Sequence, residues 1–246
     1  MGRPWLPQLP RLVALLLVID GLLALGFTVQ LVVGIESTTI AWHLHPGRES
    51  NVPTWYSSML WTLAAGLFAI YARLPPPGLK GGIRLFLPVA GALVLSLDEV
   101  AQFHEWIGDR SDALLPGGTR EGTIVSGTGI WMLILVPIAV AAAVWVAHLL
   151  ADHLRAAPAA ARLIACGGIL FVLGAGVIEL IANLAVGDRP LQLGIQVVEE
   201  LSEMIGATVV IWGGMELLRV HGIRVQRLRP GTPAGQADPP DAPARV

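Results

Sequence analysis

Residues 192–218 read QLGIQVVEELSEMIGATVVIWGGMELL. The segment is long and apolar enough to cross a bilayer, which takes about 20 such residues. It also carries Glu199, Glu200 and Glu203, and no Lys or Arg lies within it. Because ionised side chains do not face lipid, an apolar helix with acids in its interior indicates a membrane protein with an internal polar cavity.

Five further segments have the length and apolar composition of membrane spans. The six predicted spans are 11–35, 55–73, 82–106, 129–150, 162–186 and 192–218. The whole chain is 54% hydrophobic and only 14% charged, which is too few charges for the surface of a soluble domain. The sequence therefore predicts an all-α, polytopic membrane helix bundle over residues 1–221. Residues 222–246, rich in Arg, Pro, Gly and Ala, are expected to form a disordered cytoplasmic tail.

The distribution of basic residues predicts the orientation. If the N-terminus lies inside, twelve of the sixteen Lys and Arg residues fall on the cytoplasmic side. The other four are Arg48, Arg110, Arg120 and Arg189. This asymmetry obeys the positive-inside rule and places the protein in a bacterial inner membrane, with both termini in the cytoplasm. The net charge of −2 gives no reason to expect a nucleic-acid partner.

Apart from Glu216 at the inner end of the sixth, seven carboxylates lie within the third, fifth and sixth predicted spans. They are Asp98, Glu99, Glu105, Glu179, Glu199, Glu200 and Glu203. An ionised acid at the bilayer centre costs roughly 2.5–3.5 kcal/mol, so seven without compensation could cost up to about 20 kcal/mol, more than the stability of a typical domain. They are therefore expected to be protonated, hydrated, hydrogen-bonded to one another or neutralised by bound cations.

Depth and helical phase predict that these acids share one chamber. Asp98, Glu179 and Glu199 each lie seven or eight residues from the outer end of their span, roughly 10–12 Å deep. On the sixth span the acids and Gln196 fall within about 100° of arc, so they form one polar stripe. We therefore expect the acidic faces of three helices to meet in the outer half of the bundle.

Imidazoles accompany the carboxylates. His104 lies within the third span, and His43 and His45 lie in the loop after the first. Carboxylate and imidazole together are the ligand set of zinc, manganese or non-haem iron. The predicted metal ligands are Asp98, Glu99, His104, Glu179, Glu199 and Glu200. Glu203 and Glu105 are the predicted catalytic residues, as proton shuttles.

The other polar residues in or near the predicted spans are expected to have structural roles or to be solvated. Asp20 lies nearer the cytoplasmic half of the first span, where a local hydrogen bond is expected. Glu216 and Arg219 are expected to form an i, i+3 ion pair at the inner helix end. His148 and His153 flank the inner end of the fourth span and are expected to be solvated.

The pattern SLDE followed by HE (Ser96 to Glu105), together with the later EExxEM (Glu199 to Met204), resembles a group of bacterial multi-span inner-membrane proteins. The likeness covers the third to sixth spans and implies no activity. Histidine boxes, HExxH, GxSxG and P-loop motifs, which mark several classes of enzyme, are absent from the sequence.

Three functions fit these patterns. The first is a metal-dependent enzyme in which the ion activates water or oxygen against a lipid-like substrate from the bilayer. The second is a cation or proton-coupled transporter that uses the same acids. The third is a non-catalytic membrane subunit or assembly factor. Between Met204 and Leu217 the sixth span has only Thr208 and Glu216 as polar residues, which favours a site open to one side.

Overall fold

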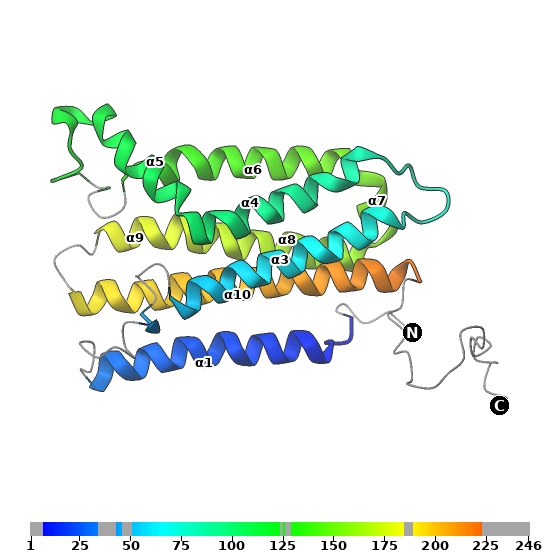
Figure 1. Ribbon diagram of the computed structural model, residues 1–246, viewed down its shortest axis with the longest axis horizontal. Coiled ribbons are helices and arrows are strands. Elements are labelled where there is room, and N and C mark those ends of the chain that lie inside the picture. The colour runs from blue at the N-terminus through cyan, green and yellow to red at the C-terminus, as the bar shows by residue number, and fades with distance from the viewer. Residues whose placement is uncertain are drawn as a thin grey trace.

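The computed structural model describes residues 7–33, 43–45, 51–123, 125, 129–184 and 189–222. Within these residues every regular element is a helix, which confirms the predicted all-α class (Figure 1). The α-helices are α1 (Arg11–Val33), α3 (Val52–Arg73), α4 (Leu87–Ala101), α5 (Phe103–Ser111), α6 (Trp131–Leu149), α7 (Ala151–Ala156), α8 (Pro158–Val172), α9 (Glu179–Leu184) and α10 (Arg189–Val220). Short helices η1 (Ile83–Phe86), η2 (Asp112–Leu114), η3 (Pro116–Gly118) and η4 (Leu173–Ile178) connect them.

Among the residues that the structure describes, four helices are long and apolar enough to cross a membrane, which indicates a membrane protein. They are α1, α6, the continuous helix Pro158–Leu184 formed by α8, η4 and α9, and Pro190–Val220 of α10. The second predicted span corresponds to α3, a more polar helix of 22 residues. The third corresponds to η1, α4 and part of α5, and α4 itself has 15 residues. Residues 34, 35, 185 and 186 of the predicted spans and 223–246 of the predicted tail lie outside the described residues.

The hydroxyl groups that make α3 polar connect it to α4. Ser58 Oγ donates to the carbonyl oxygen of Ser96 at 2.9 Å, and Ser96 Oγ donates to that of Ser58 at 2.9 Å. Thr62 Oγ1 also lies 2.9 Å from Ser96 Oγ. Hydroxyls that bond across a helix pair are satisfied without water, so these side chains are compatible with an apolar environment.

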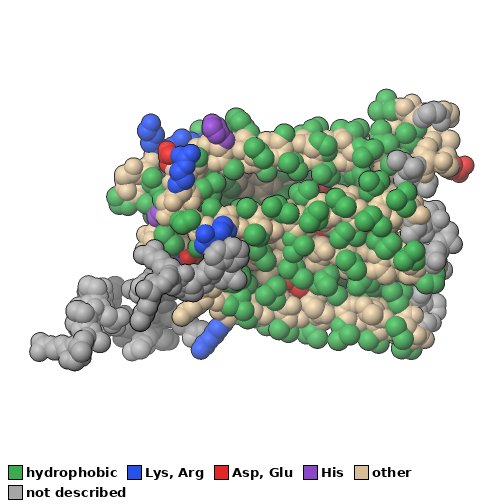
Figure 2. Space-filling view, turned by 180° about the vertical axis from the view of Figure 1, so that it is seen from behind, with side chains coloured by type: hydrophobic (Ala, Val, Ile, Leu, Met, Phe, Trp, Pro, Cys, Tyr) green, Lys and Arg blue, Asp and Glu red, His purple; other side chains and the backbone are tan. Residues whose placement is uncertain are grey.

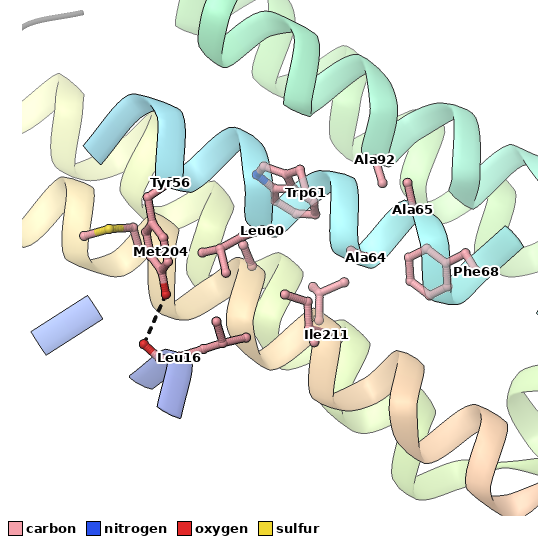
Figure 3. Packing of buried hydrophobic residues seen from close by; sticks show 12 residues of the cluster. Leu16, Tyr56, Leu60, Trp61, Ala64, Ala65, Phe68, Ala92, Met204 and Ile211 are labelled. Atoms are coloured by element: carbon pink, nitrogen blue, oxygen red, sulfur yellow. Dashed lines mark hydrogen bonds between the residues drawn. The ribbon is translucent and has the colours of Figure 1, made fainter. Parts of the chain in front are cut away.

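Helix α10 lies at the centre of the bundle. It packs against α1, α3, α8, η4 and α9, and in Figure 1 it runs between α1 and the α8–α9 helix. The largest hydrophobic cluster gathers on its α3 side, where Met204 and Ile211 meet Leu60, Ala64 and Trp61 (Figure 3). By contrast, α6 lies at the periphery, because only Trp131 and Met132 among its residues are buried.

Glycines bring α8 and α10 into backbone contact. A Cβ on Gly167 would lie 2.6 Å from the carbonyl oxygen of Gly206, and a Cβ on Gly206 would lie 2.8 Å from that of Gly167. A Cβ on Gly213, seven residues after Gly206, would lie 2.6 Å from Ile164 Cγ1. Small residues at helix interfaces allow close backbone approach, which is a common way of packing helices in membranes.

The two ends of the bundle differ in charge. Seen from behind, hydrophobic side chains cover most of the length between the ends, and the Lys and Arg side chains in view gather at the end where α7 lies (Figure 2). At that end Arg219 binds Glu216 through two bonds of 2.6 and 2.7 Å, which confirms the predicted ion pair.

One prediction for this end is wrong. His153 is only 2% exposed rather than solvated, whereas His148 is exposed as expected. The His153 Nδ1 atom lies 2.7 Å from the Tyr71 hydroxyl, and Nε2 lies 3.2 Å from the carbonyl oxygen of Lys80. His153 therefore connects α7 to the C-terminal end of α3, a contact between residues 82 positions apart that local sequence could not indicate.

Candidate functional site

Asp98 and His104 meet where the third predicted span breaks. The span was expected to be continuous over 82–106, but Gln102 adopts a left-handed conformation with φ of 57° between α4 and α5. Asp98 Oδ1 accepts the backbone N–H of His104 at 3.1 Å, and Asp98 Oδ2 lies 2.8 Å from His104 Nδ1. The Asp98 side chain thus binds the first turn of α5, where helical N–H groups lack partners within their own helix. The contact between Asp98 and His104 therefore stabilises the interruption of the helix at Gln102.

Four carboxylates act electrostatically on that of Glu203. They belong to Glu200, Glu99, Glu199 and Glu179, which come from α4, α9 and α10. We call these five residues the acidic centre. The structure therefore brings acids from the third, fifth and sixth predicted spans toward one another. The roles assigned to them stay predictions.

Glu179 and Glu199 form one side of the acidic centre. Glu179 is buried at the start of α9, and the Glu199 carboxylate lies within its electrostatic reach. Neither Glu199 nor Glu203 forms an ion pair with any described residue. Their negative charges are therefore not balanced by a Lys or Arg within the described part of the chain.

The helix that carries Glu179 departs from α geometry next to the acidic centre. Residues Leu173–Ile178 form a π-helix, η4, which ends one residue before Glu179. Gly174 within it lies against α10, because a Cβ there would come 2.8 Å from Glu203 Cγ and 3.1 Å from the carbonyl oxygen of Glu199. Such π-helical turns occur frequently at functional sites.

Glu200 also faces a pocket on the other side of α10. The pocket is small, with a volume of about 10 Å³, and lies between α1, α3 and α10. Its lining is otherwise apolar and consists of Leu23, Ala24, Phe27, Leu44, Pro53, Val197 and Met204. Glu200 is the single ionisable side chain among these residues. The acids of α10 are therefore divided between two faces of the helix.

The loop after α1 reaches this pocket. Leu44 forms part of its wall, and the ring of His45 packs edge-on against Phe27 with their centroids 5.0 Å apart. The Asn51 side chain donates to the backbone carbonyl of His45, which fixes this part of the loop at the start of α3. His43 is exposed.

The predicted metal ligands do not form one ligand shell in the described residues, where no group of three or more His, Cys, Asp or Glu is arranged to hold a metal ion. Asp98 and His104 pair at the α4–α5 junction, and Glu179 and Glu199 lie between α9 and α10. Glu105, a predicted proton shuttle, is exposed in the first turn of α5 and is not among the acids that act on Glu203. Metal binding stays a prediction.

The hydrogen bonds of Asp20 differ from those predicted from the sequence. Asp20 of α1 is 0% exposed, and its carboxylate accepts hydrogen bonds from two other helices. Tyr56 of α3 donates to Oδ1 at 2.8 Å, and Thr208 of α10 donates to Oδ2 at 3.0 Å. The expected local hydrogen bond is therefore wrong. The available signal was that Asp20 and Thr208 are isolated polar residues at the middle of two apolar spans.

Comparisons with known proteins give the family of the chain. No curated protein and no solved structure matches it. A family model described as a domain of unknown function, DUF8692, matches residues 11–216 and so covers α1 through nearly all of α10. The chain therefore belongs to the DUF8692 family.

Proposed function

We propose that this protein is a proton-coupled cation transporter of the bacterial inner membrane. The observation that carries this proposal is the position of Glu203, which lies within electrostatic reach of four other carboxylates and forms no ion pair with a described residue. Glu199 and Glu203 lie close to other carboxylates and have no Lys or Arg partner among the described residues, so ionising both of them in a low-dielectric interior is costly. The acidic centre therefore holds protons or takes up other cations.

Backbone irregularities on two helices support a role beyond packing. The left-handed Gln102 lies three residues after Glu99, and the π-helix η4 ends directly before Glu179. Both irregularities cost stability relative to a regular helix, and such features cluster at functional sites. Helix α10 is continuous past Glu199 and Glu203, so it can serve as the fixed side of the acidic centre.

Polar groups also extend further inward than the sixth span alone suggests. Thr208 does not stand isolated in its span, because its hydroxyl binds Asp20 of α1. Thr208 lies five residues beyond Glu203 on α10, or about 7.5 Å along the helix axis. A transporter needs polar positions at successive depths, and Asp20 supplies one that lies further inward than the acidic centre.

The transporter would have six spans, with α3 and α4 crossing the membrane as well. The 22 residues of α3 cover about 33 Å, enough for a hydrocarbon core of about 30 Å. The four residues of η1 and the 15 of α4 together cover about 30 Å. In this arrangement the end with α7 faces the cytoplasm, and Arg120 with its partners Asp109 and Asp112 lies outside.

Exchange of protons for added cations in liposomes tests this function. The full chain is reconstituted with a pH-sensitive dye inside, and K⁺, Na⁺, Mg²⁺ or Mn²⁺ is added outside. We expect at least one of these ions to drive proton efflux that Glu203→Gln reduces to the rate of protein-free liposomes. The matched control is Glu121→Gln, at an exposed residue of the outer loop, which should retain wild-type exchange.

Two results would overturn the transporter. One is proton efflux that does not exceed that of protein-free liposomes with any of the four ions. The other is exchange that is equally fast in wild type and Glu203→Gln. Either result, combined with the absence of bound metal, would favour a non-catalytic membrane subunit in which the acids only hold helices together.

A metal-dependent enzyme acting on a lipid-like substrate is the second candidate. The 2.8 Å contact between Asp98 and His104 favours it, because a carboxylate commonly orients an imidazole that binds a metal ion. Zinc, manganese or iron would be held near Glu99, Glu199 and Glu200. Element analysis of the purified protein tests this candidate: a stoichiometric metal that is lost in Glu199→Gln plus Glu203→Gln supports it, and its absence from wild type removes it.

A further inference from the structure

Asp20 is the most deeply buried carboxylate among the described residues. It is 0% exposed, compared with 4% for Glu216 and 7% for Glu179. Its two oxygens accept from Tyr56 at 2.8 Å and from Thr208 at 3.0 Å, so α1, α3 and α10 all contribute to its environment. Both partners are neutral hydroxyls. Burial without a cation is costly for a carboxylate and far less so for a carboxylic acid.

The pocket that contains Glu200 lies one helical turn outward from Asp20. On α1 the pocket residues Leu23 and Ala24 follow Asp20 by three and four positions. The corresponding pocket residue on α3 is Pro53, three positions before Tyr56, and on α10 it is Met204, four positions before Thr208. With α1 running outward and the other two helices running inward, all three offsets point the same way. The hydroxyls around Asp20 therefore lie beneath the base of the pocket.

The same three helices become apolar one turn further inward. Leu16 of α1, Leu60 of α3 and Ile211 of α10 belong to one buried hydrophobic cluster (Figure 3). Each lies three or four residues on the inner side of Asp20, Tyr56 or Thr208. On the outward side Asp20 therefore lies next to the pocket, whose lining is apolar apart from Glu200, whereas on the inward side tightly packed apolar side chains close the space between the three helices.

The Tyr56 hydroxyl has one proton and two acceptors. It lies 2.8 Å from Asp20 Oδ1 and 3.2 Å from the carbonyl oxygen of Leu16, the contact drawn in Figure 3. With Asp20 ionised, the tyrosine proton points to Oδ1. With a proton on Oδ1, Asp20 donates to the Tyr56 oxygen, and the tyrosine proton turns to the carbonyl of Leu16. Both charge states of Asp20 therefore keep the Tyr56 hydroxyl hydrogen-bonded.

We propose that Asp20 is a second proton-binding site, reached from the outer side through the α1–α3–α10 pocket and stabilised in both charge states by Tyr56. It rests on the proposed function, because it extends proton uptake inward from the acidic centre. The bond formed is O–H on Asp20 Oδ1. The bond broken is the O–H of the donor, which is either the Glu200 carboxyl, left as a carboxylate, or a hydronium ion, left as water. The O–H bond of Tyr56 stays intact, because the tyrosine proton only changes its acceptor.

Other ionisable groups around Asp20 in the described residues come from two helices and from the loop after α1. Between Arg11 and Val33, α1 contains no ionisable residue except Asp20. From α3 the facing group is Tyr56, and from α10 the groups on the outward side are Glu200 in the pocket and Glu203 behind it. From the loop, the His45 imidazole packs against the pocket residue Phe27. Acids, a phenol and an imidazole all bind protons, so the proton is the cation that these groups can share.

Infrared spectra of the full chain in lipid test whether Asp20 takes up a proton. Between alkaline and acidic pH, we expect wild type to gain a protonated-carboxyl band that is lost in Asp20→Asn. Tyr56→Phe should shift this band, because it removes one hydrogen-bond partner. Tyr71→Phe is the matched control, since Tyr71 is also a buried tyrosine of α3 but binds His153, and it should leave the band unchanged.

A Glu203→Gln background separates this site from the proposed function. A band that persists in Glu203→Gln and disappears when Asp20→Asn is added supports proton binding at Asp20, whether or not liposomes show exchange. Spectra that are identical in wild type and Asp20→Asn at every pH would overturn the inference and leave the Glu203 result standing. If Asp20→Asn does not fold, Tyr56→Phe provides the test. A protonated-carboxyl band that does not shift in this variant would then overturn proton binding at Asp20.

Discussion

Gly174 of the π-helix lies directly against the side chain of Glu203, since a Cβ on this glycine would come 2.8 Å from Glu203 Cγ. Gly174→Ala should therefore lower the free energy of unfolding by about 1–3 kcal/mol, the usual cost of overpacking. The carbonyl oxygen of Glu199, at 3.1 Å, cannot move away without displacing α10. Thermal or denaturant unfolding in detergent measures the change.

Gly168 provides the matched control for this substitution. It lies one turn and a half earlier in the same helix, and a Cβ there would meet nothing within 4 Å. Gly168→Ala should therefore stabilise the protein by up to about 1 kcal/mol through helix propensity alone. Equal destabilisation by both substitutions would contradict the close contact at Gly174.

The Ser96 hydroxyl is the centre of the hydrogen bonds between α3 and α4. Ser96→Ala should reduce the free energy of unfolding by about 0.6 kcal/mol and at most about 1.7 kcal/mol, the average and the maximum for interhelical hydrogen bonds in membranes. The hydroxyls of Ser58 and Thr62 lose a partner at 2.9 Å in this variant. Thr28→Ala is the control, because Thr28 bonds only to the carbonyl of Ala24 in its own turn, and its effect should stay within about 0.5 kcal/mol.

Six spans with the N-terminus inside predict which loops are accessible from outside the cell. Cys166, which is exposed on α8, is first replaced by Ala. A cysteine introduced at the exposed residue Glu121 should react with a membrane-impermeant maleimide in intact cells. One at the exposed residue Pro77, between α3 and η1, should react only after lysis. Labelling of both positions in intact cells would show that α4, which lies between them in the sequence, does not cross the membrane as proposed.

Burial, and secondly the neighbouring His153, lower the pKa of the His221 imidazole from its ordinary value of 6.5. The unfolded chain therefore binds this proton at a higher pH than the folded protein does. Stability is fully present above pH 6.5 and is lost as the pH falls from 6.5 through the lower folded pKa. Unfolding temperatures measured between pH 8 and pH 5 should show this loss.

Two variants assign that loss to His221. His221→Phe keeps a ring beside Tyr71, whose centroid lies 5.4 Å away, and it should lose less stability on acidification than wild type. His148→Gln, at an exposed position on α6, should follow the wild-type profile. A wild-type profile in His221→Phe would mean that other groups cause the pH dependence.

Hydrophobic length and acid placement were sufficient to predict the all-helical class and the approach of acids from three spans. The sequence could not reveal the break at Gln102, because the residues around it have ordinary helical character. The break depends on Asp98, whose carboxylate binds the N–H of His104. Nor could it reveal the π-helix before Glu179, because that depends on close packing against α10.

The environment of Asp20 shows a different limit of the sequence. Its partners Tyr56 and Thr208 lie 36 and 188 positions away. Helical phase within one span assigns a residue to a face, but it does not identify the neighbour that covers this face. The pocket beside Glu200 could not be predicted for the same reason. The sequence predicts that Glu200 shares a polar stripe with Glu199 and Glu203, but the pocket depends on where α1 packs against α10.

The glycine contacts between α8 and α10 determine which parts of this protein can move. Because Gly167 and Gly206 face each other's backbone carbonyls, the two helices cannot rotate or slide past one another without a collision. The two helices therefore form one rigid unit, which carries Glu199 and Glu203. Helix α1 is joined to these two helices by the bond from Thr208 to Asp20 and by buried Leu16. Any conformational change in the proposed transporter would therefore leave the α8–α10 pair intact and move other helices around it.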